Sequence, residues 1–160
     1  MNSEDFQKFL LDSNTVMALT QQESVDDQKV ILKVGSLKKS TKLYISILSI
    51  YEMEYGATHA PEQELTDKAK LAIESITTED KITILPLTKQ GAQIFGEIKE
   101  LYRQKKGVGK KALQKHNIDL IIAATAIEHQ AILVSHDNKD KIFEILQENR
   151  SDFDWEDWMS

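Results

Sequence analysis

The stretch NIDLIIAATA at residues 117–126 decides the fold of this chain. A single carboxylate, Asp119, opens a segment that is otherwise apolar and rich in small residues, which is typical of a buried helix. An aspartate in the first turn of such a helix lies where free backbone N–H groups and the helix dipole favour negative charge. Taken alone, Asp119 is therefore interpreted as a helix cap.

Acids elsewhere in the chain give Asp119 a second interpretation. Strands are expected at residues 9–11, within 43–50 and at 131–135, where apolar and β-branched residues cluster. At the end of each expected strand, where the chain turns or enters a helix, stands one acid: Asp12, Glu52 and Asp137.

The remaining pattern alternates helices with strands. Helices are expected at 15–20, 25–38, 51–57, 65–76, 88–106 and 119–129, a further strand at 82–87, and a closing strand at 153–158. The predicted order is β-α-α-β-α-α-β-α-α-β-β. Strands separated by helices pair in parallel and are covered on both faces. The sequence therefore predicts an α/β fold, a three-layer sandwich with a central, mainly parallel sheet, formed by one domain over residues 1–160.

In such a sheet, functional groups gather beyond the carboxyl ends of the strands. Asp12, Glu52 and Asp137 follow strands, and reversal of the chain at the helix of Asp119 brings that acid to the same edge. Uncompensated, the four carboxylates would repel one another and raise their pKa values. A hard divalent cation such as Mg²⁺ or Mn²⁺ prefers oxygen ligands and resolves this repulsion. We therefore expect a metal site at this edge.

Composition sets the wider limits. The 160 residues include no cysteine, which excludes disulfides, thiolate metal sites and a catalytic thiol. The apolar runs are far shorter than the ~18–20 residues of a membrane span, so no membrane partner is expected. Residues 1–5 are polar and acidic, unlike a secretory signal. We expect a cytoplasmic protein.

The net charge of -6 argues against a nucleic-acid partner, but the charge is unevenly distributed. Residues 99–115 hold seven basic side chains and one acid. Four of these basic residues lie just before the helix of Asp119 and are candidates for contact with RNA phosphates: Lys105, Lys106, Lys110 and Lys111. The alternative is a solvated helix face followed by a hinge at residues 107–109, and the sequence leaves both open.

Four motifs together resemble the PIN domain family, and closely its VapC-type toxin ribonucleases. They are LDSN at 11–14, IYEMEYGA at 50–57, DLIIAATA at 119–126 and LVSHD at 133–137. No single motif is strongly specific, but their order and spacing match over residues 9–158. The resemblance implies a metal-dependent endoribonuclease that uses Mg²⁺ or Mn²⁺, acts as the toxin of a toxin–antitoxin pair, binds an antitoxin protein and is commonly a homodimer.

The resemblance also implies roles for individual residues. Asp12, Glu52, Asp119 and Asp137 match the acidic positions of the family, and Ser135 matches its small hydroxyl position. Asn14 and Asp140 are further supporting candidates. The segment after the fourth motif departs from the family, which usually places an acid and an aromatic at closer spacing. Asp140 therefore competes with Asp137 for the fourth acidic role, and we rank Asp137 first because it is nearest the strand end. For both, a polar turn is the alternative.

Other functions stay open at this stage. A phosphatase on a similar sheet would normally show a pair of aspartates near the first strand, and the second is missing here. A PIN-like scaffold that only binds nucleic acid, or a nuclease without an antitoxin, is the other alternative. No histidine is assigned as a general base. The RNA substrate, the cut position and the number of metal ions are not determined by the sequence.

The segment around Glu52 carries a further hypothesis about assembly. Tyr51, Met53 and Tyr55 provide more apolar area than one buried helix face needs, which favours a homodimer interface. Packing of these side chains in the core is the alternative.

Overall fold

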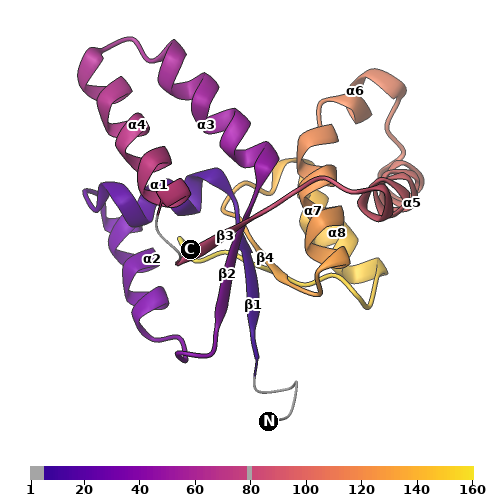
Figure 1. The fold of residues 1–160 in the computed structure, drawn as a ribbon. Coiled ribbons are helices and arrows are strands. Elements are labelled where there is room, and N and C mark those ends of the chain that lie inside the picture. The colour runs from indigo at the N-terminus through magenta and orange to yellow at the C-terminus, as the bar shows by residue number, and fades with distance from the viewer. Residues whose placement is uncertain (1–5, 79–80) are drawn as a thin grey trace.

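The computed structural model describes residues 6–78 and 81–160, so the polar segment 1–5 lies outside the described residues. Five parallel strands form one sheet in the order β3-β2-β1-β4-β5 (Figure 1). The central strand β1 (Lys8–Leu11) pairs with β2 (Lys42–Ser46) and β4 (Ile132–Val134). The outer strands are β3 (Ile82–Leu85) and β5 (Trp155–Glu156). The predicted α/β sandwich with a parallel sheet is confirmed.

Helices cover both faces of the sheet. One layer contains α1 (Ser13–Gln21), α2 (Val25–Gly35), α3 (Ile47–His59) and α4 (Gln63–Thr78). The other contains α5 (Lys89–Lys106), α7 (Asn117–Glu128) and α8 (Ile142–Asn149). The short α6 (Lys110–Gln114) connects α5 to α7, and a 3₁₀ turn (Lys139–Lys141) precedes α8.

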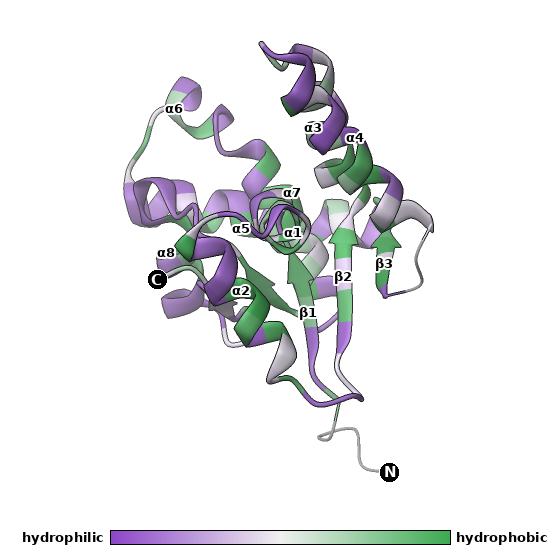
Figure 2. Ribbon diagram, turned by 90° about the vertical axis from the view of Figure 1, so that its left-hand side faces the viewer, coloured by the Kyte–Doolittle hydropathy of each residue, from purple (hydrophilic) through white to green (hydrophobic). Residues whose placement is uncertain are grey.

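Side chains of the strands alternate between two hydrophobic cores, as the period of two in a strand requires. Leu10 and Leu133 pack under α5, α7 and α8, whereas Phe9, Leu11 and Ile45 face α1 to α4. Figure 2 shows the strands as largely hydrophobic ribbons in the middle of the molecule. Burial on both faces explains why β1 lacks the polar alternation of a half-exposed strand.

The buried helix predicted from residues 117–126 is confirmed. In α7, every residue from Ile122 to Ile127 is buried, and Asp119 lies in the first turn. The helix packs against α5. This packing fixes the position of Asp119 because the apolar body of the helix cannot slide without exposing its core side chains.

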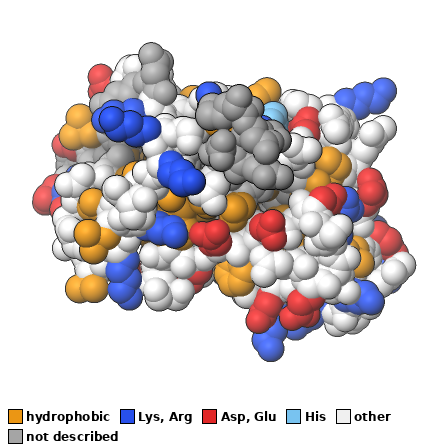
Figure 3. All heavy atoms as spheres, turned by 90° about the horizontal axis from the view of Figure 1, so that it is seen from below, with side chains coloured by type: hydrophobic (Ala, Val, Ile, Leu, Met, Phe, Trp, Pro, Cys, Tyr) orange, Lys and Arg blue, Asp and Glu red, His pale blue; other side chains and the backbone are white. Residues whose placement is uncertain are grey.

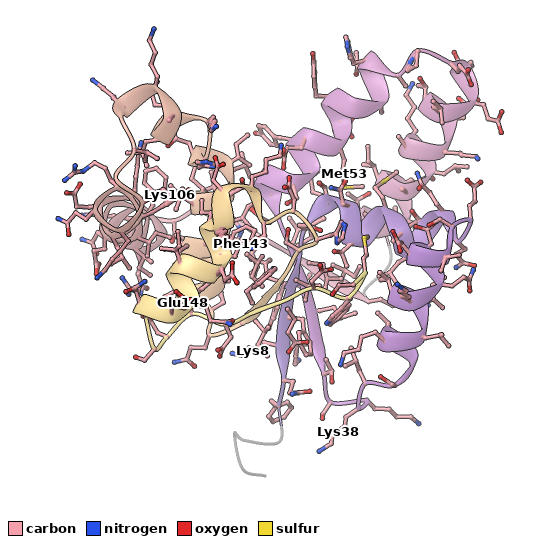
Figure 4. The ribbon with its side chains drawn as sticks, turned by 180° about the vertical axis from the view of Figure 1, so that it is seen from behind. Lys8, Lys38, Met53, Lys106, Phe143 and Glu148 are labelled. Carbon is pink, nitrogen blue, oxygen red and sulfur yellow. The ribbon has the colours of Figure 1, made fainter. Side chains whose placement is uncertain are left out.

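Two helices were not predicted, and a third begins earlier than predicted. Helix α8 stands between β4 and β5, where we predicted no helix, because Ile142, Phe143 and Leu146 form an apolar stripe that is buried (Figure 4). Helix α6, which was not predicted, follows residues 107–109, the hinge of the alternative interpretation, and Gly107 there ends α5 in a left-handed conformation at φ 70°. Helix α3 starts at Ile47, four residues earlier than predicted, and Ser46 caps it by accepting from Leu48 N.

No helix within residues 6–78 and 81–160 is long and apolar enough to cross a membrane.

Candidate active site

The predicted acids lie on four different elements beyond the carboxyl ends of the strands. Asp12 follows β1 and caps α1, Glu52 lies in α3 after β2, and Asp137 lies in the loop after β4. Asp119 enters from the first turn of α7. Their charges act on one another, since the charges of Asp119, Asp12 and Asp137 all raise the pKa of Glu52. Acids separated by up to 125 positions in the chain, from Asp12 to Asp137, therefore share one electrostatic environment.

Asp12 is held on both of its carboxylate oxygens. Oδ1 accepts from the backbone N–H of Thr15 at 2.8 Å, and Oδ2 accepts from Ser135 Oγ at 2.7 Å. Burial raises the pKa of Asp12, and these two hydrogen bonds oppose that rise. Ser135 Oγ also accepts from the backbone N–H of Asp137 at 3.2 Å, so one buried hydroxyl links the first and fourth acids.

Asp119 is the most strongly perturbed of the four acids. Burial, followed by the charge of Asp137, raises its pKa to about 6. His116 and Lys139 oppose this rise, and the side chain remains 27% exposed. Ionising Asp119 therefore costs more free energy in the folded protein than in an unfolded chain, and a nearby cation would offset this extra cost.

Glu52 is the exposed member of the four acids. Partial desolvation raises its pKa, together with the charges of the other three. It borders a hollow of about 450 Å³ between α1, α3 and α4, which is also lined by Asn14, Tyr55 and His59. The supporting candidate Asn14 thus lies beside Glu52, while Asp12, Asp119 and Asp137 do not line this hollow.

Asp140, the competitor for the fourth acidic role, turns to other partners. Its Oδ2 lies 2.9 Å from His116 Nε2 and 3.3 Å from Lys115 Nζ. The hydrogen bond from His116 is the main reason that its pKa is lowered. Asp140 is not among the charges that raise the pKa values of Asp12, Glu52 or Asp119, whereas Asp137 is.

The acidic set fits a hard divalent cation in its chemistry. Ionised carboxylates are the oxygen ligands such cations prefer, and the raised pKa values of Glu52 and Asp119 indicate negative charge that the protein compensates only in part. As they stand, no three His, Asp or Glu side chains in the described part of the chain form a closed set of metal ligands.

Comparison with known protein families identifies the family of this chain. The PIN domain family matches residues 9–146, which is most of the chain. The chain belongs to the PIN domain family. The resemblance inferred from the four motifs is thereby confirmed. No curated protein sequence matches the chain.

Solved structures share the fold of this PIN domain. A chain of the VapBC2 complex from Rickettsia felis, bound to a DNA fragment from its promoter, has a TM-score of 0.69 at 19% identity over 95% of this chain and 99% of that chain. A chain of VapBC-1 from nontypeable Haemophilus influenzae has a TM-score of 0.68 at 22% identity, covering 96% and 100%. VapC20 from Mycobacterium tuberculosis, described as a toxin that cleaves the sarcin-ricin loop, has a TM-score of 0.56 at 10% identity, covering 83% and 92%. At these identities the likeness shows the fold.

The basic segment of this PIN domain is partly paired. Arg103 pairs with Glu100 at 2.5 Å, and Lys115 pairs with Asp140. The four predicted RNA-contacting lysines are all exposed: Lys105 and Lys106 end α5, and Lys110 and Lys111 open α6. Figure 1 shows α6 at the same end of the molecule as the start of α7, and Figure 4 labels Lys106 below it.

The aromatic segment around Glu52 divides between core and surface. Met53 is buried against the core beneath α3, so the expectation that it forms part of an interface is wrong (Figure 4). Tyr51 and Tyr55 are 68% and 67% exposed, and Tyr55 stacks on His59 with ring centroids 5.4 Å apart. Only the two tyrosines remain available to a partner.

His116 is the residue of this region that the sequence analysis did not assign. It is buried, lies three residues before Asp119, and contacts both Asp119 and Asp140. The spacing carried a signal, because residues three apart at the start of a helix face the same side. That signal is weak without the position of Asp140, which comes from a loop 24 residues away.

Proposed function

We propose that this PIN domain is a metal-dependent endoribonuclease and acts as the toxin of a toxin–antitoxin pair. The observation that carries the proposal is the set of four carboxylates from separate elements at the carboxyl end of the sheet, where the charge of Asp137 raises the pKa values of the other three. Membership of the PIN family, with a fold shared by VapBC chains, supports a nuclease. A toxin reported to cleave the sarcin-ricin loop shares the fold, which supports RNA as the substrate class.

Asp12, Glu52, Asp119 and Asp137 would hold Mg²⁺ or Mn²⁺. A bound divalent metal would make a water nucleophilic at neutral pH and neutralise charge on the phosphate. Ser135 and the Thr15 N–H fix both oxygens of Asp12, so this carboxylate is oriented before any ligand arrives. Asp137 takes the fourth position in preference to Asp140, whose carboxylate already pairs with Lys115 and accepts a hydrogen bond from His116.

The partners follow from the same assignment. RNA is guided to the acidic site by Lys105, Lys106, Lys110 and Lys111, because a chain of net charge -6 needs a local basic surface to attract phosphate. An antitoxin protein is the regulatory partner, as in the VapBC complexes that share the fold. An acidic antitoxin segment on these lysines would make inhibition partly competitive with RNA. We place the protein in the cytoplasm, where both partners occur.

Homodimer formation is a further part of the proposal. The exposed Tyr51 and Tyr55 form the aromatic face of α3 beside Glu52, and large exposed aromatic side chains mark interaction surfaces. The purified protein without antitoxin should have a dimeric mass in light scattering at micromolar concentration. Replacing both tyrosines by glutamate should give a monomer. A monomeric mass of the unaltered protein would reject this face as a dimer interface.

The test of function is an RNA cleavage assay with purified protein. Structured and single-stranded RNAs are incubated with Mg²⁺, with Mn²⁺ and with EDTA, and the Asp119→Asn variant is assayed beside the unaltered chain. The proposal expects endonucleolytic fragments that require metal and are lost in the variant. Binding of RNA without cleavage under every metal condition would instead support the scaffold alternative. Metal-dependent cleavage that no co-expressed antitoxin suppresses would support a nuclease outside toxin–antitoxin systems.

A further inference from the structure

His116 occupies a position that is fixed on two sides. Its side chain is 2% exposed at the junction of α6 and α7. Nε2 lies 2.9 Å from Asp140 Oδ2, and the ring packs edge-on against Tyr102 with centroids 5.5 Å apart. A buried imidazole held by one hydrogen bond and one aromatic contact has little freedom to rotate.

The loop that presents Asp140 is itself held in an unusual conformation. Asp140 and Lys141 have φ values of 52° and 58°, a left-handed region that non-glycine residues rarely adopt in succession. The Tyr102 hydroxyl donates to the backbone carbonyl of Asp140 at 3.1 Å, and Lys115 Nζ lies 3.3 Å from its carboxylate. Contacts from α5 and α6 therefore keep the Asp140 carboxylate against His116.

The other ring nitrogen of His116 faces the acidic site. Nδ1 is buried, has no hydrogen-bond partner in the described part of the chain, and lies 4.0 Å from Asp119 Oδ2. This distance is longer than a hydrogen bond. Buried polar atoms are nearly always paired, so one that points at a functional carboxylate calls for an explanation. Hydrogen bonds of active sites are often long without ligand and shorten when the site is filled.

We infer that His116 is a positioning residue for Asp119: Asp140 accepts from Nε2–H and Tyr102 packs against the ring, so that Nδ1–H donates to the Asp119 carboxylate and holds it in the orientation that binds a divalent cation. The inference rests on the proposed function, since it assigns Asp119 to the metal site. Asp140 then acts through His116 and does not itself bind metal. Groups that orient metal-binding carboxylates in this way are worth about 10-fold to 100-fold in metal affinity or activity.

Two substitutions separate the two nitrogens. In asparagine the amide nitrogen is bonded to Cγ, as Nδ1 is in histidine. The variant His116→Asn therefore keeps a polar group facing Asp119 and loses the group facing Asp140. Glutamine extends one carbon further, so His116→Gln keeps a group near Asp140 and leaves the Nδ1 position empty. We expect His116→Gln to weaken Mn²⁺ binding by about 10-fold to 100-fold in isothermal titration calorimetry, and His116→Asn by less than about 10-fold.

Kinetics give a second measure. A positioning role lowers kcat for RNA while KM stays within about twofold, because the lost interaction matters at the reacting centre and not for RNA binding. His136→Gln is the matched control, since His136 also pairs with an aspartate, Asp157 at 3.0 Å, but on the exposed side of the fourth motif. Mn²⁺ affinity should be unchanged in this control.

Asp140→Ala keeps the inference testable if His116→Gln does not fold, because Asp140 is exposed. It should weaken Mn²⁺ binding by about three- to tenfold, as the ring loses its anchor. The inference is overturned if folded His116→Gln binds Mn²⁺ within twofold of the unaltered chain, or if His116→Asn is as weak as His116→Gln. The proposed function fails separately, if the unaltered protein binds Mn²⁺ in an Asp119-dependent manner yet cuts no RNA.

Discussion

Asp137 and Asp140 stand three residues apart in one loop, yet their surroundings are opposite. Asp140 accepts from His116 and pairs with Lys115, and its pKa is lowered. Asp137 pairs with Lys139 at 3.6 Å, and its charge raises the pKa values of Asp12, Glu52 and Asp119. The protein thus pairs one acid closely and leaves its neighbour in a cluster of acids whose negative charge Lys139 offsets only in part, here termed the uncompensated cluster. Acids with a structural role resemble Asp140, whereas a cation site requires the surroundings of Asp137.

The opposite end of the sheet shows the ordinary state of charge in this molecule. Seen from below, acidic and basic side chains are interspersed over the surface (Figure 3). Asp152 is typical of a compensated acid: Arg150 binds it at 2.7 Å, and this hydrogen bond lowers its pKa. The pKa is raised for Asp12, Glu52 and Asp119, and all three lie at the carboxyl end of the sheet. The carboxyl end of the sheet is therefore an exception within one chain.

The comparison within the loop predicts the largest difference between two variants. Asp137→Asn should weaken Mn²⁺ binding by more than about 100-fold, beyond the 10-fold to 100-fold cost of losing a supporting group. Asp140→Asn retains an oxygen that accepts from His116 and should stay within about threefold of the unaltered protein. Isothermal titration calorimetry with Mn²⁺ measures both. The reverse ranking would assign the fourth metal-binding role to Asp140.

Stability without metal provides a second test of the comparison. The raised pKa of Asp119, about 6, means that the folded state holds its proton more tightly than the unfolded state. The free energy of unfolding therefore falls as pH rises from about 4 to about 6 and stays lower above. Asp119→Asn cannot ionise, so in EDTA at pH 7.5 it should be more stable by about 1–3 kcal/mol, a range that allows for solvent screening at this partly exposed group.

Two changes of condition control this prediction: a lower pH and the addition of Mn²⁺. At about pH 3 the gain of Asp119→Asn should nearly disappear, because Asp119 is then mostly protonated in both the folded and the unfolded state. With saturating Mn²⁺ the order should reverse, since only the unaltered chain gains the free energy of tight binding. If Asp119→Asn is less stable than the unaltered protein in EDTA at pH 7.5, as measured by thermal unfolding, the charge of Asp119 is compensated in the folded state and the prediction is wrong.

Much of this fold could be predicted from local patterns in the sequence. The apolar run in α7 and the strands that end at acids determine the parallel sheet and its functional edge, because burial and strand direction are properties of short segments. Helix α8 was missed because its stripe of Ile142, Phe143 and Leu146 follows a polar turn with two left-handed residues, which obscures the start of a helix. A break in the hydrophobic periodicity at this point is typical of a loop.

The candidate site was less predictable than the sheet that carries it. Which acids share the edge follows from topology, but the partners of each acid depend on loop conformation. The contact between Asp140 and His116 joins segments 24 residues apart and relies on left-handed backbone at Asp140, which no propensity specifies. The helical period places Tyr51 and Tyr55, four residues apart, on one face of α3 and Met53 on the opposite face. Which of the two faces is buried depends on the elements that pack against the helix.

Ser135 offers a milder way to disturb the uncompensated cluster. Its hydroxyl donates to Asp12 and lowers the pKa of that carboxyl. Ser135→Ala should raise this pKa further and weaken Mn²⁺ binding by about tenfold. The matched control is Ser49→Ala, since Ser49 is equally buried but its hydroxyl has no hydrogen-bond partner in the described part of the chain. Equal Mn²⁺ affinities of the two variants would show that the hydroxyl does not support Asp12.

The smallest effect concerns the exposed cations that balance the acidic edge. Replacing Lys110 and Lys111 by glutamate should weaken RNA binding by a similar factor for all sequences, because phosphate contacts carry no base information. Each lost contact to single-stranded RNA should flatten the slope of log affinity against log salt concentration by about 0.7.

Lys38 and Lys39 are a matched pair of exposed neighbours at the far end of the sheet, where Figure 4 labels Lys38. Reversing their charge alters the net charge equally but should leave the slope unchanged. Equal slopes for both double variants would mean that net charge alone governs RNA binding, and that α6 is a solvated surface.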